Sequence, residues 1–329
     1  MLILGFLSGL LGMLALMALW PLPEPMARSQ PDPAADYEAA IARFGVLREA
    51  ETAHVARPGR SRLLTHGGQT AVVTVLVHGA TSSPQQMVEM GRLLFAQGQN
   101  VLILRLPYHG YVSLRVGELA SLRLGTLRAY ADTAVDLAAG LGARVQVVGM
   151  SGGGTVAAWL AQNRPDVARV ALIAPFFTPA GVPAWAAVPA IRLFGRLPSV
   201  TLSDPREERR PYVYRGQATR GAVAFMRLGQ AVLAQAEEAR AQAGEVGVLL
   251  IAGDSVVNNA ATARLLAAWQ AQGTAINTVT LPAERGVPHN GIDPSRPAEM
   301  RAAVYDALLP LLGVQFDWAL WQRMTAVHS

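Results

Sequence analysis

The most constraining feature of this chain is a Gly-x-Ser-x-Gly pattern from Gly149 to Gly153, centred on Ser151. An apolar run ending in Val147-Val148 leads into it, and a helix-like pattern from Thr155 to Gln162 follows. The order of strand, serine and helix predicts a sharp turn that exposes the serine hydroxyl. Small residues are needed there because the strand and helix backbones come close together and the serine itself is strained. The pattern therefore predicts an α/β fold with a reactive serine, provided that partner residues follow in the right order.

Composition narrows the class of protein. The 329 residues are 51% hydrophobic and 16% charged, which is enough for one large α/β domain with an insertion. The chain has no cysteine, which excludes disulfides, thiolate metal sites and a cysteine nucleophile, and we expect no metal or cofactor. The net charge of +5 is spread along the chain, without the basic face and aromatic platforms that nucleic-acid binding needs. We expect no nucleic-acid partner.

An uninterrupted, uncharged run from Leu2 to Trp20 opens the chain. As a helix it would be close to the roughly 30 Å thickness of a hydrocarbon core. Trp20 is suited to the membrane interface, and Pro21 would end the helix. We therefore expect residues 1–20 to form an uncleaved, single-pass transmembrane anchor in a bacterial inner membrane, with the main domain outside the cytoplasm. The alternative is a signal peptide and secretion, although no basic residue precedes the run and no Ala-x-Ala site follows it.

Residues 21–60 are expected to form a linker and a leading helix. Prolines at 21, 23, 25, 31 and 33 predict a stiff, extended segment, and residues 37–52 have helical spacing. Two strands are then expected, at 62–66 and 71–77, joined as a hairpin across Gly67-Gly68.

Strands and helices alternate through the rest of the chain. Further strands are expected at 101–106, 144–148, 170–174, 246–252 and 276–281, and helices at 84–97, 125–140, 259–272 and 297–312. This alternation predicts a mainly parallel, doubly wound sheet with helices on both faces. We expect residues 61–174 and 241–313 to form this core, and residues 314–329 to form a C-terminal tail.

Residues 175–240 interrupt the alternation. They open with a stretch rich in proline and aromatic residues, Pro175 to Trp185, and end in a helical segment, Ala222 to Arg240. An insertion at this point, after the strand that follows the serine, is placed to cover the serine. We expect a cap or lid, with a surface excursion that merely packs on the sheet as the alternative.

A serine hydroxyl is a weak nucleophile until a neighbouring base removes its proton. Of the six histidines, His289 follows the last expected strand, so its loop would return over the strand ends where α/β sheets place their sites. His78 and His109 each end a strand ahead of a glycine and are expected to orient loops. His289 is therefore the expected base.

The third group of such a site is an acid that holds the imidazole in one tautomer and stabilises its cation. Asp254 follows an expected strand, and the resulting chain order is Ser151, Asp254, His289. Asp293 is the rival acid, but it follows the histidine by only four positions and is as well suited to cap a turn. Asp254 is the expected acid.

Two backbone amides are expected to form an oxyanion hole, which stabilises negative charge on the attacked carbonyl. Gly152, the residue after the serine, would supply one amide, and Ala80, in the loop after the strand at 71–77, would supply the other.

These motifs together resemble the carboxylesterase and monoacylglycerol-lipase branch of the α/β-hydrolases. The resemblance covers about residues 60–313 and rests on the runs Val77 to Pro84, Leu106 to Gly110, Gly149 to Gly153, Ala252 to Val257, and Pro288-His289. It implies a serine esterase that forms an acyl-enzyme, with a helical cap over an acyl pocket. This chain departs from the resemblance at Ala80, where relatives often carry a bulky aromatic, and at Gly152 to Gly154, where three glycines would loosen the start of the helix.

The sequence thus predicts a serine hydrolase that cleaves carboxylic esters, either acyl esters or monoacylglycerol-like lipids, through an acyl-enzyme on Ser151. The catalytic residues would be Ser151, Asp254 and His289, with Ala80 and Gly152 as the oxyanion hole. A small-molecule or lipid ester would be the substrate, and the membrane would be a partner through the N-terminal helix. The alternatives are an amide- or peptide-cleaving hydrolase of the same fold and a non-catalytic, membrane-tethered binding protein.

Overall fold

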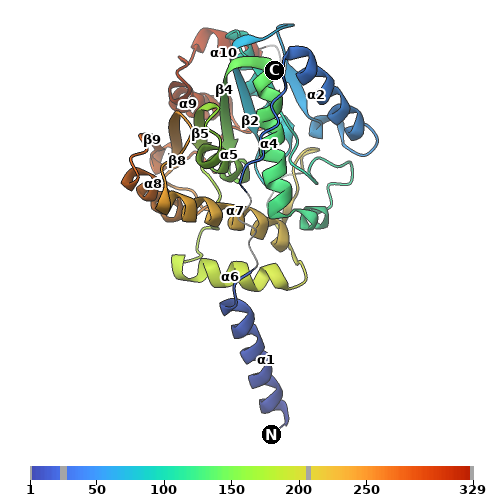
Figure 1. The fold of residues 1–329 in the computed structure, drawn as a ribbon, viewed down its shortest axis with the longest axis vertical. Coiled ribbons are helices and arrows are strands. Elements are labelled where there is room, and N and C mark those ends of the chain that lie inside the picture. The colour runs from blue at the N-terminus through green and yellow to red at the C-terminus, as the bar shows by residue number, and fades with distance from the viewer. Residues whose placement is uncertain (1, 23–27, 205–208, 327–329) are drawn as a thin grey trace.

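A computed structural model describes residues 2–22, 28–204 and 209–326. Met1 of the expected anchor, residues 23–27 of the linker, 205–208 of the expected cap and 327–329 of the tail lie outside this range. The described chain folds around one seven-stranded sheet with helices on both faces (Figure 1). Its strand order is β1-β3-β2-β4-β5-β8-β9.

All neighbouring strands of the sheet are parallel except β1, which is antiparallel to β3. The central strands are runs rich in valine, leucine and isoleucine that are buried on both sides, as expected where helices cover both faces of a parallel sheet. The strands are β1 (Arg62–Leu64), β2 (Thr70–Val77), β3 (Asn100–Ile103), β4 (Gly142–Met150), β5 (Val167–Ile173), β8 (Glu245–Ile251) and β9 (Ile276–Leu281). The predicted parallel α/β architecture is confirmed.

The expected hairpin between the first two strands is wrong. β3 lies between β1 and β2, and Arg62 pairs with Ile103 instead of with a residue of β2. The glycine segment is a crossing loop that Asn100 fastens to the start of β3. Asn100 accepts from the His66 amide (2.9 Å) and donates to the Gly68 carbonyl (2.7 Å). Both edges of β2 are occupied by its parallel neighbours, so no edge remains for β1.

Helices cover the sheet in two layers. On one face α4 and α5 lie side by side against β2, β4 and β5, with α2 packed on α4 (Figure 1). On the other face α3 and α9 are joined by an ion pair between Glu89 and Arg301 (2.8 Å). The helices are α2 (Tyr37–Glu51), α3 (Val88–Ala96), α4 (Leu124–Leu141), α5 (Gly152–Asn163), α8 (Asn259–Ala271), α9 (Ala298–Leu308) and α10 (Trp318–Ala326).

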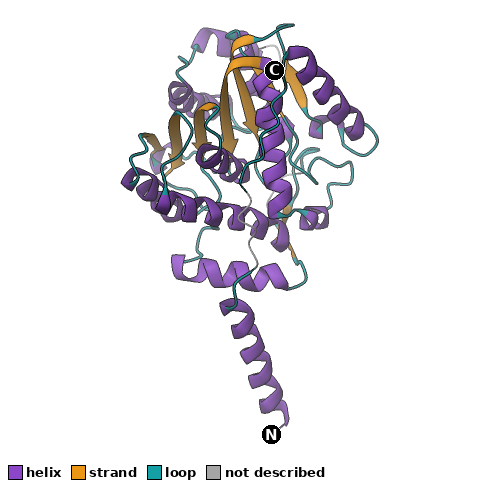
Figure 2. Cartoon of the chain, viewed as in Figure 1, coloured by secondary structure: helices purple, strands orange, loops and turns teal. Residues whose placement is uncertain are grey.

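The insertion between β5 and β8 contains two helices and a short ribbon. These elements are α6 (Ala184–Arg196), β6 (Thr201–Ser203), β7 (Gly216–Ala218) and α7 (Thr219–Glu238). α7 packs on α5 of the core, and α6 lies across α7 on the side away from the sheet (Figure 2). Phe225 of α7 is fully buried, and its ring lies within 3.1 Å of where a side chain on Gly152 would stand. The insertion therefore packs directly over the residue that follows Ser151.

The N-terminal helix α1 (Leu2–Leu19) is attached to the molecule at its C-terminal end, where it meets α6 (Figure 1). Arg192 and Arg196 of α6 donate to the carbonyls of Leu19 (2.7 Å) and Met17 (2.9 Å), so cationic groups meet the negative end of the helix dipole. No helix in the described part of the chain is both long and apolar enough to cross a membrane. The expected transmembrane anchor is therefore not supported.

A buried ion network lies at the end of α5. The Arg164 side chain is completely buried and donates to Asp132 (3.2 Å) and Asp136 (2.8 Å) of α4 and to Asp166 (2.6 Å). The two aspartates of α4 also accept the amides of Gln30 and Asp32, each at 3.0 Å. One guanidinium thus fastens α5 to α4 and, through the carboxylates, α4 to the linker.

Candidate active site

Ser151 lies on a strained turn between β4 and α5. Its backbone has φ 55° and ψ −116°, which non-glycine residues rarely adopt. The strands around the turn hold this conformation. The Ser151 amide donates to the Ile173 carbonyl (2.9 Å), and its carbonyl accepts from the Phe176 amide (3.0 Å). The predicted elbow is therefore present.

The glycines around Ser151 are needed for close packing. A side chain on Gly149 would stand 2.1 Å from the Gly153 carbonyl oxygen, and one on Gly153 would stand 2.3 Å from the Val77 carbonyl oxygen. One on Gly154 would stand 2.9 Å from Pro175. α5 begins at Gly152, immediately after the serine. The three consecutive glycines, expected to loosen the helix start, instead let it press against the neighbouring loops.

Asp254 and His289 are joined by a hydrogen bond. The His289 Nδ1–H donates to Asp254 Oδ2 at 2.7 Å, while Oδ1 of the same carboxylate accepts the amides of Val256 (2.8 Å) and Val257 (3.1 Å). The Asp254 side chain is fully buried, and 13% of the His289 side chain is exposed. Burial opposes ionisation of Asp254, but His289 and the two amides outweigh it and hold the pKa of the carboxyl below its usual value. The carboxylate is therefore ionised at neutral pH.

Ser151 and His289 line the same cavity, which has a volume of about 560 Å³. Gly79 and Ala80 line it as well, while Asp254 stands behind His289 outside the lining. Among the described residues, none forms a hydrogen bond with the Ser151 hydroxyl, so the link from serine to histidine is open in this structure. Such hydrogen bonds are often long in ligand-free enzymes and shorten when substrate binds.

His78 sets the orientation of the loop that carries Ala80. Its Nε2 accepts from the Leu106 amide (3.0 Å), so the proton of the neutral ring is on Nδ1, which donates to the Gly79 carbonyl (2.9 Å). The N–H of Ala80 belongs to that same peptide group and points the opposite way. The side-chain oxygen of Gln86 accepts a hydrogen bond from the Gly79 amide (2.8 Å) and so holds the peptide group between His78 and Gly79.

The two expected oxyanion donors are neighbours in the structure. A side chain on Gly152 would lie 2.8 Å from the Ala80 methyl group. The second buried histidine, His109, lies on the other side of the loop, with Nε2 2.7 Å from the Ala80 carbonyl oxygen and Nδ1 2.8 Å from that of Pro107. His78 and His109 therefore orient loops, as the sequence predicted.

Burial lowers the pKa of His78 well below its usual value, with a further contribution from His109, and burial also lowers the pKa of His109. The His78 ring, whose Nε2 accepts the Leu106 amide, is therefore neutral in the folded chain, while in the unfolded chain it binds a proton near pH 6.5. The contribution of His78 to the free energy of unfolding should therefore be fully present above about pH 6.5 and fall below it, by up to about 1.4 kcal/mol per pH unit. Urea unfolding between pH 8 and pH 5 measures this, and a flat profile would contradict it.

A contact between the insertion and the His289 loop could not be predicted from sequence patterns. Asp293, the rival acid, is buried and accepts from Arg210 (2.8 Å) and from the Tyr212 hydroxyl (2.8 Å) of the insertion. Burial, followed by the effect of Asp293, raises the pKa of Tyr212 to about 12. It is Asp254 and not Asp293 that bonds to His289. Asp293 instead fastens the insertion to the loop that carries His289.

A serine on a strand-to-helix turn, with an Asp–His pair from the loops after two later parallel strands, defines an α/β-hydrolase arrangement. Residues 74–325 match the alpha/beta hydrolase family, and the chain belongs to that family. A comparison with curated proteins found no match.

Several solved structures have a similar fold. A soluble variant of monoglyceride lipase from Saccharomyces cerevisiae, in complex with a substrate analogue, is 12% identical, with a TM-score of 0.60 over 89% of this chain and 99% of that one. The monoacylglycerol lipase of Paleococcus ferrophilus is 18% identical, with a TM-score of 0.52 over 76% and 98%. Est1E from Butyrivibrio proteoclasticus, with bound ferulic acid, is 15% identical, with a TM-score of 0.50 over 79% and 99%. At these identities the likeness establishes the fold.

Proposed function

We propose that the protein is a serine hydrolase that cleaves carboxylic esters through an acyl-enzyme on Ser151. The observation that carries this proposal is the hydrogen bond between Asp254 and His289, at 2.7 Å, because His289 lines the same cavity as a strained serine. Strain of this kind persists only where the surrounding structure enforces it, and it is common at active sites. The solved structures of similar fold include a monoglyceride lipase and a monoacylglycerol lipase, which supports the choice of ester substrates.

In this mechanism the Ser151 Oγ attacks the ester carbonyl carbon while His289 Nε2 takes the hydroxyl proton. Asp254 keeps the ring in the tautomer with Nε2 free and stabilises the imidazolium that forms. The amides of Ala80 and Gly152 bind the oxyanion of the tetrahedral intermediate. The intermediate collapses as His289 returns its proton to the leaving alcohol. A water molecule, deprotonated by His289, then attacks the carbonyl carbon of the acyl-enzyme in the same way, and the acid is released.

The lining of the catalytic cavity supports an ester with an apolar acyl part. Apolar side chains from the core and from the insertion face the cavity together: Met150, Phe176, Leu202, Val213 and Tyr214. Ala80, at the oxyanion loop, also lines the cavity and has only a methyl group as its side chain. We propose acyl esters or monoacylglycerol-like lipids as the substrates.

Labelling with a fluorophosphonate, followed by mapping of the modified residue by mass spectrometry, tests the chemistry. We expect the label on Ser151 and on no other serine. Two alternatives remain: an amide- or peptide-cleaving hydrolase with the same groups, and a binding protein that keeps the fold. Failure to label Ser151 would favour the binding protein. A higher kcat/KM on an anilide than on the matched ester, among substrates of graded acyl length, would favour the amide hydrolase.

His78 gives a separate test of the oxyanion loop. Its replacement, His78→Ala, removes the donor that orients the Ala80 amide, so kcat on a short ester should fall about a hundredfold while KM stays within about threefold. Gln86→Met, which removes the acceptor of the Gly79 amide, should also lower kcat. Steady-state kinetics measure both variants, with exposed His66→Ala as the matched control. A rise in KM with unchanged kcat would contradict this role.

The location of the protein is a prediction from residues 1–20 alone. We propose a place at the outer side of a bacterial inner membrane, or secretion after signal cleavage. Fractionation of cells that express the full chain, with sequencing of the mature N-terminus, separates the two.

A further inference from the structure

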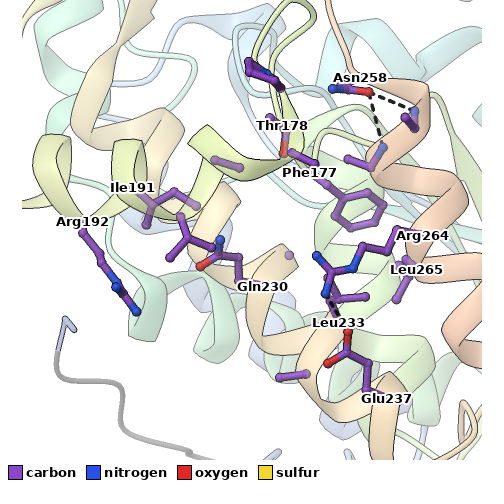
Figure 3. Close-up of a pocket in the computed structure, with 18 of the residues that line it drawn as sticks. Phe177, Thr178, Ile191, Arg192, Gln230, Leu233, Glu237, Asn258, Arg264 and Leu265 are labelled. Carbon is purple, nitrogen blue, oxygen red and sulfur yellow. Dashed lines mark hydrogen bonds and ion pairs between the residues drawn. The ribbon is translucent and has the colours of Figure 1, made fainter. Parts of the chain in front are cut away.

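A second cavity, of about 650 Å³, lies between α6, α7 and α8 (Figure 3). Among the described residues, no lining residue is shared with the catalytic cavity. The segment from Phe176 to Pro179 is the common wall. Phe176 and Pro179 line the catalytic side, whereas Phe177 and Thr178 line the second cavity. The second cavity is therefore a separate space and not an extension of the catalytic one.

The walls of the second cavity are largely apolar. Phe177, Ile191 and Leu265 are buried residues from three different elements, and Leu233 of α7 lies among them (Figure 3). Gly229 also lines it, and a side chain there would stand 2.6 Å from the Phe177 ring. The volume lies within the range of about 300–1,000 Å³ that is typical of small-molecule sites. An apolar space of this size favours an aliphatic or aromatic body.

The charged groups at the rim of the second cavity are not balanced. Glu237 and Arg264 pair with each other at 2.8 Å on one side. Arg192 lies on the opposite side (Figure 3) and donates to the Leu19 carbonyl, which carries only the partial negative charge of the C-terminal end of α1. Within the part of the chain that the structure describes, no carboxylate lies within ion-pair distance of Arg192. A full positive charge that meets only the partial charge of a helix end, beside an apolar cavity, favours an anionic head on the ligand.

We propose that the second cavity binds one amphiphile with a single aliphatic chain and an anionic head, of the fatty-acid type. The chain would lie between Phe177, Ile191, Leu233 and Leu265, and the head would lie at Arg192. This site does not depend on the proposed hydrolase activity, because it shares no lining residue with the cavity of Ser151.

The test is calorimetric titration of the full-length Ser151→Ala protein with dodecanoate below its micelle concentration. We expect one equivalent to bind. Ala261→Phe, which fills the cavity from α8, should lower the affinity at least tenfold. Ala263→Phe is the matched control, because Ala263 lies two residues away on the exposed side of α8 and does not line the cavity. Arg192→Gln should weaken dodecanoate about tenfold and leave the binding of dodecanol unchanged.

Two results would overturn the proposal. One is the absence of saturable dodecanoate binding. The other is binding that survives Ala261→Phe but is lost in Ala222→Phe, because Ala222 lines the catalytic cavity instead. Melting temperatures of all variants show that loss of binding is not loss of folding. The source of the chain is tested with phosphatidylcholine vesicles that contain lysophosphatidylglycerol, a membrane amphiphile with one acyl chain and an anionic head. Vesicle binding that Ala261→Phe abolishes would assign the site to a membrane lipid, and binding of dodecanoate alone would assign it to a free acid.

Discussion

Replacing Ser151 with alanine should lower kcat on a short p-nitrophenyl ester by about four to six orders of magnitude. Without the hydroxyl no acyl-enzyme forms, and only the oxyanion donors and the binding cavity remain to accelerate attack by water. The melting temperature should change little, because alanine at this position removes one oxygen and keeps the turn. Steady-state kinetics and thermal melts of the purified full-length chain measure both quantities.

Ser255→Ala is the matched control, because Ser255 is exposed, lines the same cavity and follows Asp254 directly. Its turnover should stay within about threefold of the parent value. If Ser151→Ala kept the parent rate, the proposed mechanism would be wrong, and attack by a water molecule would have to replace the serine. His289→Ala would then show whether a general base is needed.

Replacing Arg164 with alanine should lower the free energy of unfolding by about 3–5 kcal/mol. Arg164 is completely buried and is the cation that Asp132 and Asp136 share, so its loss leaves two mostly buried carboxylates facing each other. Those carboxylates also accept hydrogen bonds from the amides of Gln30 and Asp32. We therefore expect the linker to be held less firmly against α4 in this variant. Urea unfolding followed by circular dichroism measures the change.

The surface pair of Arg169 and Glu245 is the control for this prediction. Two nitrogens of Arg169, Nη2 and Nε, donate to the two carboxylate oxygens of Glu245 at 2.7 and 3.0 Å, but 55% of the Glu245 side chain is exposed. Arg169→Ala should cost at most about 1 kcal/mol, because solvent already screens that pair. Equal losses in the two variants would show that the buried network contributes no more than a surface pair, contrary to our interpretation.

The parts of the fold that could be predicted are those with local signals. The turn at Ser151 was predictable because it needs small residues at fixed spacing, and the strands were predictable because buried parallel strands are continuous apolar runs. Asp254 and His289 could be singled out because each follows such a strand, and the carboxyl ends of parallel strands meet at one edge. The hairpin prediction for β1 was wrong because the pairing of β1 is not local. Two adjacent strands with a glycine turn indicate a hairpin, but the pairing partner of β1 is β3, which comes later in the chain.

Local sequence patterns were enough to predict the α/β class, the strained serine and the residues that could act with it, because backbone sterics and strand order act over short stretches. The folded structure was needed to show the hydrogen bond from His289 to Asp254 and to reveal that Asp293 fastens the insertion. The Arg164 network and the second cavity at Arg192 were likewise visible only in the folded chain. These features depend on distances between side chains far apart in the chain, and such distances are set by packing, which no local pattern encodes.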